Sequence, residues 1–250
     1  MKHIIYACLA ITAFIPALNG SEEPVFRHFQ LTDRRKRIVE IKKLDDQSAI
    51  AEFAKNDEID GVSLTALGLI NDQTLLADVA KNSIHTEVRR RATKQLEDQS
   101  TLEAIAQNDT NHQVRAAAVF LITNQVFLVN IANSEEQYQV RGTAVERLEN
   151  KTLLADFAQN DTNEWVRLAA AYKLNEQAFY EDIVKNCKDS FVRQNAIGGI
   201  SDKDFLAQIA KNEQNELVRK SAMSKLDDLN KKEKAKEATP ESTETEKSKP

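Results

Sequence analysis

Few residues of this 250-residue chain have the types and spacing that catalysis or metal binding requires. Beyond the first twenty residues the histidines are His28, His85 and His112, and the one cysteine is Cys187. None stands in a His-x-x-x-His, Cys-x-x-Cys or Glu-x-x-His arrangement, which would place two metal ligands side by side. There is also no glycine-rich phosphate loop and no Gly-x-Ser-x-Gly nucleophile turn. The sequence therefore predicts no catalytic residue, no metal and no cofactor.

One pairing of charged residues does recur, because an acidic residue is followed six positions later by an arginine. The pairs are Asp109 and Arg115, Glu135 and Arg141, Asp161 and Arg167, and Glu213 and Arg219; Arg89 and Arg193 stand at the same arginine position. A catalytic residue needs to occur only once in a chain. Recurrence at a fixed interval therefore favours a structural role for all of these residues.

The charged pairs belong to a repeat of 26 residues that continues without insertion or deletion. Its seven units begin at Asp46, Asp72, Asp98, Asn124, Asn150, Glu176 and Asp202. Every unit has a valine sixteen residues after its start, an alanine after twenty and Ile or Leu after twenty-four. Self-similarity at this period is typical of stacked supersecondary units.

Each unit contains two groups of apolar residues with helical spacing. In the third unit they are Leu102, Ile105 and Ala106, then Val114, Ala118, Val119 and Ile122. Both groups mark one face of an α-helix, and the polar residues between them favour a turn. The spacing predicts helices over 99–107 and 113–122. Because no proline occurs between Pro24 and Pro240, we expect an all-α fold in which stacking covers the apolar faces.

The two ends of the repeat region differ from its middle. Residues 32–44 match only the second helix of a unit, with Arg37, Ile41 and Leu44 in register, so 21–45 is predicted to be an N-terminal segment with a capping helix. The repeats then occupy 46–229. Residues 230–250 have no apolar side chain larger than alanine and are predicted to form a disordered charged tail.

The first twenty residues have the order of a secretory signal peptide. Lys2 precedes an apolar run over 4–15, and Pro16 and small residues follow. We expect cleavage after Gly20, with Ala17 as the alternative, and a mature protein that is exported to the periplasm or secreted. A retained membrane anchor is the competing interpretation, although the apolar run is short for a bilayer span.

Charge and cysteine content narrow the possible partners. The whole chain has 34 basic and 39 acidic residues. Removal of the first twenty residues takes away one basic residue, Lys2, so the mature chain is more acidic still. Phosphate backbones need a basic surface, so nucleic acid is excluded, and no membrane span is expected in the mature chain. Cys187 then has no internal disulfide partner, and in an oxidising compartment it must be buried, reactive or paired with another chain; burial is the simplest interpretation.

The pattern of the units resembles HEAT-type repeats, in particular short bacterial forms. Val-Arg occurs in six of the seven units and is followed by the alanine and by Ile or Leu, over residues 46–227. The resemblance implies a right-handed α-solenoid of seven two-helix repeats with an N-terminal capping half-repeat. It also implies that the acidic residues and arginines form a hydrogen-bonded ladder between turns, interrupted at Ser63 and Cys187. The period is short for the family, so the first helix is expected to have only two turns or to be partly 3-10.

A partner-binding surface is expected where the repeats differ. Positions fifteen, eighteen and twenty-two of a unit should face outward from its second helix. Large apolar residues occupy them in the later units: Phe120, Trp165, Leu168, Tyr172, Phe191 and Leu217. Exposed aromatic clusters mark interfaces. The competing interpretation is that these rings pack between neighbouring helices as ordinary core.

These observations predict an exported protein- or peptide-binding scaffold without catalytic activity. One alternative is an enzyme of lyase or isomerase type, because some HEAT-like proteins act on tetrapyrroles, which is an analogy of fold alone. Another alternative is a purely structural spacer of the cell envelope.

Overall fold

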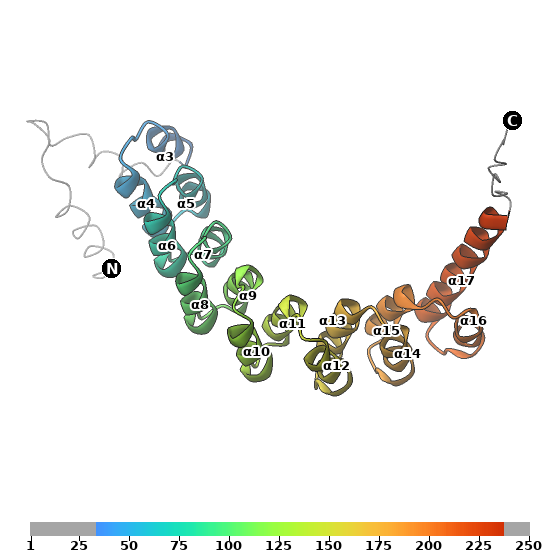
Figure 1. Cartoon of the computed structure of the whole chain (residues 1–250). Helices are drawn as coiled ribbons and strands as arrows, with labels where there is room; N and C mark the ends of the chain where they lie inside the picture. The colour runs from blue at the N-terminus through green and yellow to red at the C-terminus, as the bar shows by residue number, and fades with distance from the viewer. Residues whose placement is uncertain (1–33, 238–250) are drawn as a thin grey trace, which may run out of the picture. The chain divides into compact units, whose positions relative to one another are not determined.

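A computed structural model describes residues 34–237 of the chain, and all of its regular structure there is helical (Figure 1). Fifteen α-helices and one 3-10 turn are present in this part, with no strand. Contacts divide the chain into two compact units, of which unit 1 ends at Glu97 and unit 2 starts at Asp98. The expected signal peptide, both expected cleavage sites and residues 238–250 lie outside the described residues.

Unit 1 contains the half-repeat and the first two repeats. Its helices are α3 (Arg34–Ile41), α4 (Gln47–Asn56), α5 (Asp60–Leu67), α6 (Gln73–Asn82) and α7 (Thr86–Thr93). Each repeat is a hairpin of a first helix, here called the A helix, and a second helix, here called the B helix. The α3 helix packs against the B helix α5, which is the place that the B helix of a preceding repeat would take.

Unit 2 contains the five remaining hairpins. Their A and B helices are α8 (Gln99–Asn108) and α9 (His112–Leu121), α10 (Gln125–Ser134) and α11 (Tyr138–Arg147), α12 (Lys151–Asn160) and α13 (Glu164–Leu174), α14 (Gln177–Asn186) and α15 (Ser190–Ala196), and α16 (Lys203–Asn212) and α17 (Glu216–Glu237). Consecutive B helices pack on one another, so they form a row along one side of this unit, with the A helices along the other (Figure 1). The predicted all-helical repeat solenoid is therefore confirmed.

Side-chain caps determine where the A helices begin. Asp46, Asp72, Asp98, Asn124, Asn150 and Asp202 each accept a hydrogen bond from a backbone N–H in the first turn, which satisfies donors that a helix start leaves free. The A helices are α-helices of ten residues each. Ten residues make about 2.8 turns, so the expectation of only two turns or a partly 3-10 helix was wrong, while the start expected at residue 99 agrees with α8.

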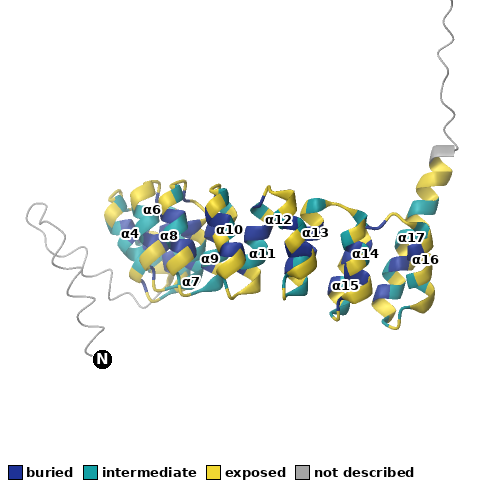
Figure 2. Cartoon of the chain, turned by 60° about the horizontal axis from the view of Figure 1, so that its bottom comes forward, coloured by how far each residue is buried: buried dark blue, intermediate teal, exposed yellow. Residues whose placement is uncertain are grey.

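The core of each unit is built from the invariant residues of the repeat. The alanines twenty residues into each unit are all fully buried: Ala66, Ala92, Ala118, Ala144, Ala170, Ala196 and Ala222. The valines four residues before them are fully buried as well. Figure 2 shows the buried residues on the helix faces that are turned toward neighbouring helices. A methyl side chain at these positions lets B helices approach closely.

Repeat six departs from the regular pattern because Tyr180 replaces the Ile or Leu of the other A helices. Its ring is buried, and α15 ends early in a 3-10 turn, Ile197–Gly199. A Cβ atom at Gly199 would lie 2.2 Å from Cε2 and 2.3 Å from Cδ2 of Tyr180. The ring therefore occupies the space that a side chain at residue 199 would need.

Gly199→Ala should accordingly destabilise the protein by about 1–2 kcal/mol, because a packed aromatic ring has to move. Chemical denaturation followed by circular dichroism measures the change. The matched control is Gly198→Ala in the same turn, since nothing lies within 4 Å of a Cβ atom there. Equal stability of the two variants would contradict this account of the turn.

The last helix extends beyond the predicted end of the repeats. α17 continues to Glu237, so residues 230–237, which were predicted to belong to a disordered tail, are helical. The Lys- and Glu-rich stretch has good helix propensity. Glu233 in this stretch forms an exposed ion pair with Lys203 at the start of α16.

Candidate functional site

The recurring arginines link the turns inside successive hairpins. Arg141 donates from Nη1 to the backbone oxygens of Glu135 and Glu136, at 3.0 Å each, in its own turn. From Nε and Nη2 it donates to the carboxylate of Asp161 in the next turn, at 3.3 and 3.0 Å. The Asp161 side chain is only 6% exposed. The guanidinium therefore hydrogen-bonds to the turns of two successive hairpins.

The same arrangement recurs along unit 2. Arg115 bonds Glu135 at 2.9 Å and Arg193 bonds Glu213 at 3.1 Å, and each donates to its own turn. In unit 1, Arg37 bonds Asp57 at 2.8 Å. Arg89 donates to Ser83, Arg167 to Asp161, and Arg219 to Glu213 and Gln214, all through backbone oxygens. Arg115, Arg141 and Arg193 therefore connect successive turns, as in the ladder that the resemblance implies.

The ladder also sets the protonation of its acids. Burial alone would raise the pKa of Glu135, but hydrogen bonds from Arg115 and from the Gln137 backbone leave that pKa below its usual value. For Glu213, burial is likewise outweighed, by the Asn215 backbone and Arg193, and its pKa is lowered too. These carboxylates therefore stay charged at neutral pH and are unsuited to act as general acids there.

The two predicted interruptions are filled by other contacts. Near Ser63, Nε2 of the His85 ring donates to the backbone oxygen of Asp57 at 2.7 Å, and the ring also contacts Asp60. At Cys187, Arg167 Nη2 lies 3.2 Å from the sulfur. Burial raises the pKa of the Cys187 thiol, and the residue is 5% exposed. Of the three interpretations of this cysteine, the structure supports burial.

Sequence reasoning missed a second ladder, made by the glutamine that begins most A helices. The side-chain amides of Gln47, Gln73, Gln99 and Gln125 each donate to the backbone oxygen 22 residues later and accept from the backbone N–H 24 residues later. Each glutamine thus closes the turn into the following repeat. Repeat five has Lys151 instead, and there α13 is followed by Asn175, which caps the helix with a left-handed φ of 53°. The repeated glutamine was the available signal.

Three large apolar side chains form a row across unit 2. Trp165, Phe191 and Leu217 are each the second residue of a B helix, in α13, α15 and α17. They are 39%, 57% and 47% exposed. We call these three residues the apolar row. Tyr138, the first residue of α11, is also exposed and adds a ring at the same end of the preceding B helix, which sequence reasoning missed.

Leu168 does not belong to this surface. It is 2% exposed and lies in the buried cluster that includes Tyr180 and Val192. The prediction that Leu168 faces outward was therefore wrong. Three residues along a helix rotate a side chain by about 60° from its starting direction, and this rotation turns Leu168 toward the neighbouring repeat rather than toward solvent.

Phe120 and Tyr172 are exposed, but they lie apart from the apolar row. They stand seven positions further along their helices, about 10 Å away in the axial direction. The Tyr172 hydroxyl donates to Asn195 O at 3.0 Å, and its ring lies 5.7 Å from that of Tyr180. The Arg147 guanidinium lies 5.7 Å over Phe120. The predicted continuous stripe is thus divided into a row and two separate rings.

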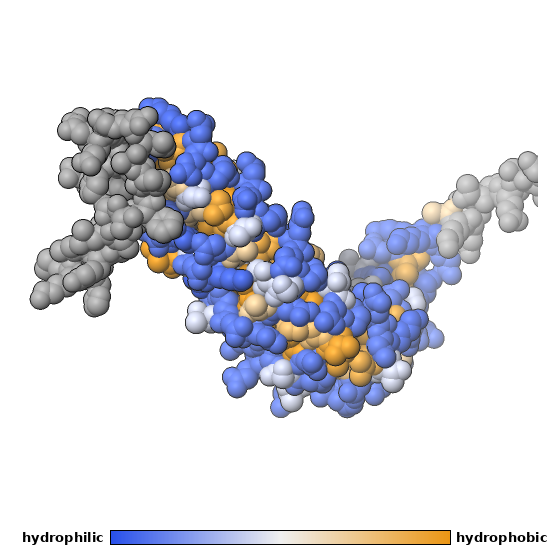
Figure 3. All heavy atoms as spheres, turned by 60° about the vertical axis from the view of Figure 1, so that its left-hand side comes forward, coloured by the Kyte–Doolittle hydropathy of each residue, from blue (hydrophilic) through white to orange (hydrophobic). Residues whose placement is uncertain are grey.

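Val39, Ile84 and Val126 are also exposed, and Figure 3 shows patches of hydrophobic residues among hydrophilic ones on one face. Within residues 34–237, no His, Cys, Asp and Glu side chains group as a metal site, and no helix there is long and apolar enough to cross a membrane. Comparison with protein-family models, curated proteins and solved structures finds no significant match to this chain.

Proposed function

We propose that this chain is an exported, HEAT-like scaffold without catalytic activity, which binds a protein or peptide through its apolar row. The observation that carries the proposal is the placement of Trp165, Phe191 and Leu217 at one repeat position in three consecutive B helices, each exposed. Large exposed apolar side chains gathered on one surface favour a binding role.

The spacing of the row indicates what would bind there. Packed helix axes lie about 8–10 Å apart, so the three side chains are offered at roughly that interval. Residues seven apart on an α-helix are separated by about 10.5 Å. An amphipathic helix laid across the B helices would therefore present matching apolar residues, in the mode in which a helix occupies an apolar surface of its receptor.

The absence of catalysis is proposed because the recurring polar residues already have structural partners. The arginines and acids satisfy turns within and between hairpins, and the glutamines close the turns between repeats. Export is proposed from the signal-like first twenty residues.

We expect a Trp165→Ala, Phe191→Ala double variant to lose its partner with little change in stability, because Phe191 is mostly solvated and Trp165 partly solvated before binding. Partners would be captured from the envelope or secreted fraction of the source organism with the wild-type chain. The chain has one tryptophan, so its emission should move to shorter wavelength and lose acrylamide quenching when the captured protein is added.

Val126→Ala is the matched control, because Val126 is an apolar side chain that is 71% exposed but lies on the A helix α10, away from the apolar row. It should retain the partner. If Val126→Ala and the double variant capture the same protein equally well, the apolar row is not the binding surface. A tryptophan that resists quenching in the free chain would also reject the proposal.

A further inference from the structure

The C-terminal end of unit 2 exposes positions that other repeats bury. Met223 on α17 is 54% exposed, whereas the residues at the same repeat position, Val145, Ala171 and Ile197, are exposed by 2% or less. The structure describes no hairpin after α17, so nothing among residues 34–237 covers this side of the helix.

The A helix of the last repeat is uncovered in the same direction. Ile209 and Ala210 on α16 are only partly buried, and so is Leu226 on α17. The corresponding residues of repeat six, Ile183 and Val184, are buried. We call Ile209, Ala210, Met223 and Leu226 the end face.

A cation at the rim of the end face lacks the acid that its counterparts bind. Arg219 donates from Nη1 to Glu213 O and Gln214 O at 2.7 Å each, as the other ladder arginines do in their own turns. Arg141 and Arg193 also bind a carboxylate in the next turn. For Arg219 the described part of the chain supplies none, and residue 239, which would stand at that position, is Thr239.

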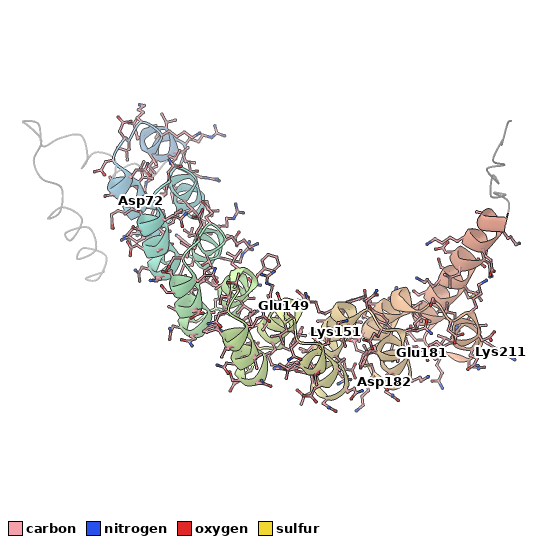
Figure 4. The ribbon with its side chains drawn as sticks, in the orientation of Figure 1. Asp72, Glu149, Lys151, Glu181, Asp182 and Lys211 are labelled. Carbon is pink, nitrogen blue, oxygen red and sulfur yellow. The ribbon has the colours of Figure 1, made fainter. Side chains whose placement is uncertain are left out.

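A second cation stands on α16. Lys211 occupies the repeat position of Lys55, which bonds Asp78 of the next A helix at 2.6 Å, and of Lys185, which lies 4.8 Å over the ring of Phe205 in the next repeat. Figure 4 labels Lys211 on α16, at the end of unit 2. Lysines at this position therefore reach toward a following hairpin, and the structure describes none beyond Lys211.

We propose that the end face binds an acidic amphipathic helix of a partner protein, which takes the place of an eighth A helix. Its apolar side chains cover Ile209 and Met223, and its carboxylates bind Lys211 and Arg219. The A helix of repeat five shows the required pattern, because Leu154 and Phe157 bury their side chains while Asp161 receives Arg141. This surface is separate from the apolar row and does not depend on it.

Two other occupants of the end face are the chain's own C-terminal residues and a second copy of the chain, and charge and composition argue against both. Residues 238–250 carry glutamates, but apart from two prolines they have no apolar side chain larger than alanine, so their sequence offers little apolar surface to bury on the end face. A second copy docked through the same end would bring Arg219 and Lys211 toward their own copies, which is unfavourable. The α3 end of a second copy exposes Arg34, Arg35 and Lys36, so it presents cations to cations.

The test uses a fluorescein-labelled peptide with the sequence of residues 150–162, titrated into the full chain and followed by anisotropy. We expect saturable binding that weakens as salt is added. An Arg219→Gln, Lys211→Gln chain should bind about tenfold more weakly, since charge-assisted hydrogen bonds are lost. A peptide with Asp156→Asn and Asp161→Asn should bind the wild-type chain about tenfold more weakly as well. The variant peptide and the variant chain together should show no further loss of affinity.

Lys220→Gln is the matched control, because Lys220 is exposed on the same helix and pairs with Glu216; it should bind like wild type. The proposal is overturned if millimolar peptide shows no saturation, or if the Arg219 and Lys211 changes leave affinity unaltered. Much tighter binding after Glu241→Gln, Glu244→Gln and Glu246→Gln would identify the chain's own C-terminal residues as the occupant. A dimer in sedimentation that the peptide dissociates would identify a second copy.

Discussion

Arg141→Ala should lower the free energy of unfolding by about 2–4 kcal/mol. The change leaves the Asp161 carboxylate, whose side chain is 6% exposed, without its guanidinium partner. The backbone oxygens of Glu135 and Glu136 lose a donor as well. Denaturant unfolding followed by circular dichroism measures the difference, and Tm should fall with it.

Lys220→Ala is the control for this experiment, because its ion pair with Glu216 is exposed on both sides and such pairs contribute little. Arg141→Ala should also leave binding at the apolar row intact. If Arg141→Ala unfolds like wild type but loses the partner of Trp165, the arginines bind a ligand and the structural assignment of the ladder is wrong.

Ala144→Leu should destabilise the protein by about 2–3 kcal/mol, because three further carbon atoms must enter a fully buried position. Ala144 lies on α11, which packs against both α9 and α13. The larger side chain therefore has to separate B helices on one side or distort its own helix. Thermal and denaturant unfolding both report the change.

The matched control is Glu146→Leu, which adds the same side chain to an exposed position of the same helix. It should be near neutral in stability. If Ala144→Leu is as stable as wild type, the contact between B helices accommodates a larger side chain. Close packing would then not explain why every repeat has an alanine at this position.

Much of the local structure could be predicted from the sequence. The helices expected over 99–107 and 113–122 are found at Gln99–Asn108 and His112–Leu121. Apolar spacing marks a helix face directly, and Asp98 and Asn111 at the caps indicate where each helix begins. The ladder was implied by the resemblance to HEAT-type repeats, and the structure shows it where Arg115, Arg141 and Arg193 bind a carboxylate in the next turn.

The candidate binding site could be predicted from the sequence only in part. Trp165 and Leu168 were both placed on the outward face, yet Trp165 is 39% exposed and Leu168 is 2% exposed. Helical periodicity gives the angle between two side chains, but not the angle at which the next helix lies against them. That second angle depends on how consecutive hairpins stack, and it decides which of the two residues is covered.

Contacts between repeats also divide into those that the sequence determines and those that only the tertiary structure decides. The period of the repeat determined by itself that seven hairpins stack and that Ala144 and its counterparts are buried, since equivalent residues must have equivalent surroundings. Only the tertiary structure revealed that Gln99 bonds backbone groups at Leu121 and Thr123, and that Met223 is uncovered. The glutamine recurs in the sequence, but its backbone partners leave no pattern of residue types that would identify them. Met223 differs from its equivalents because no described hairpin follows it.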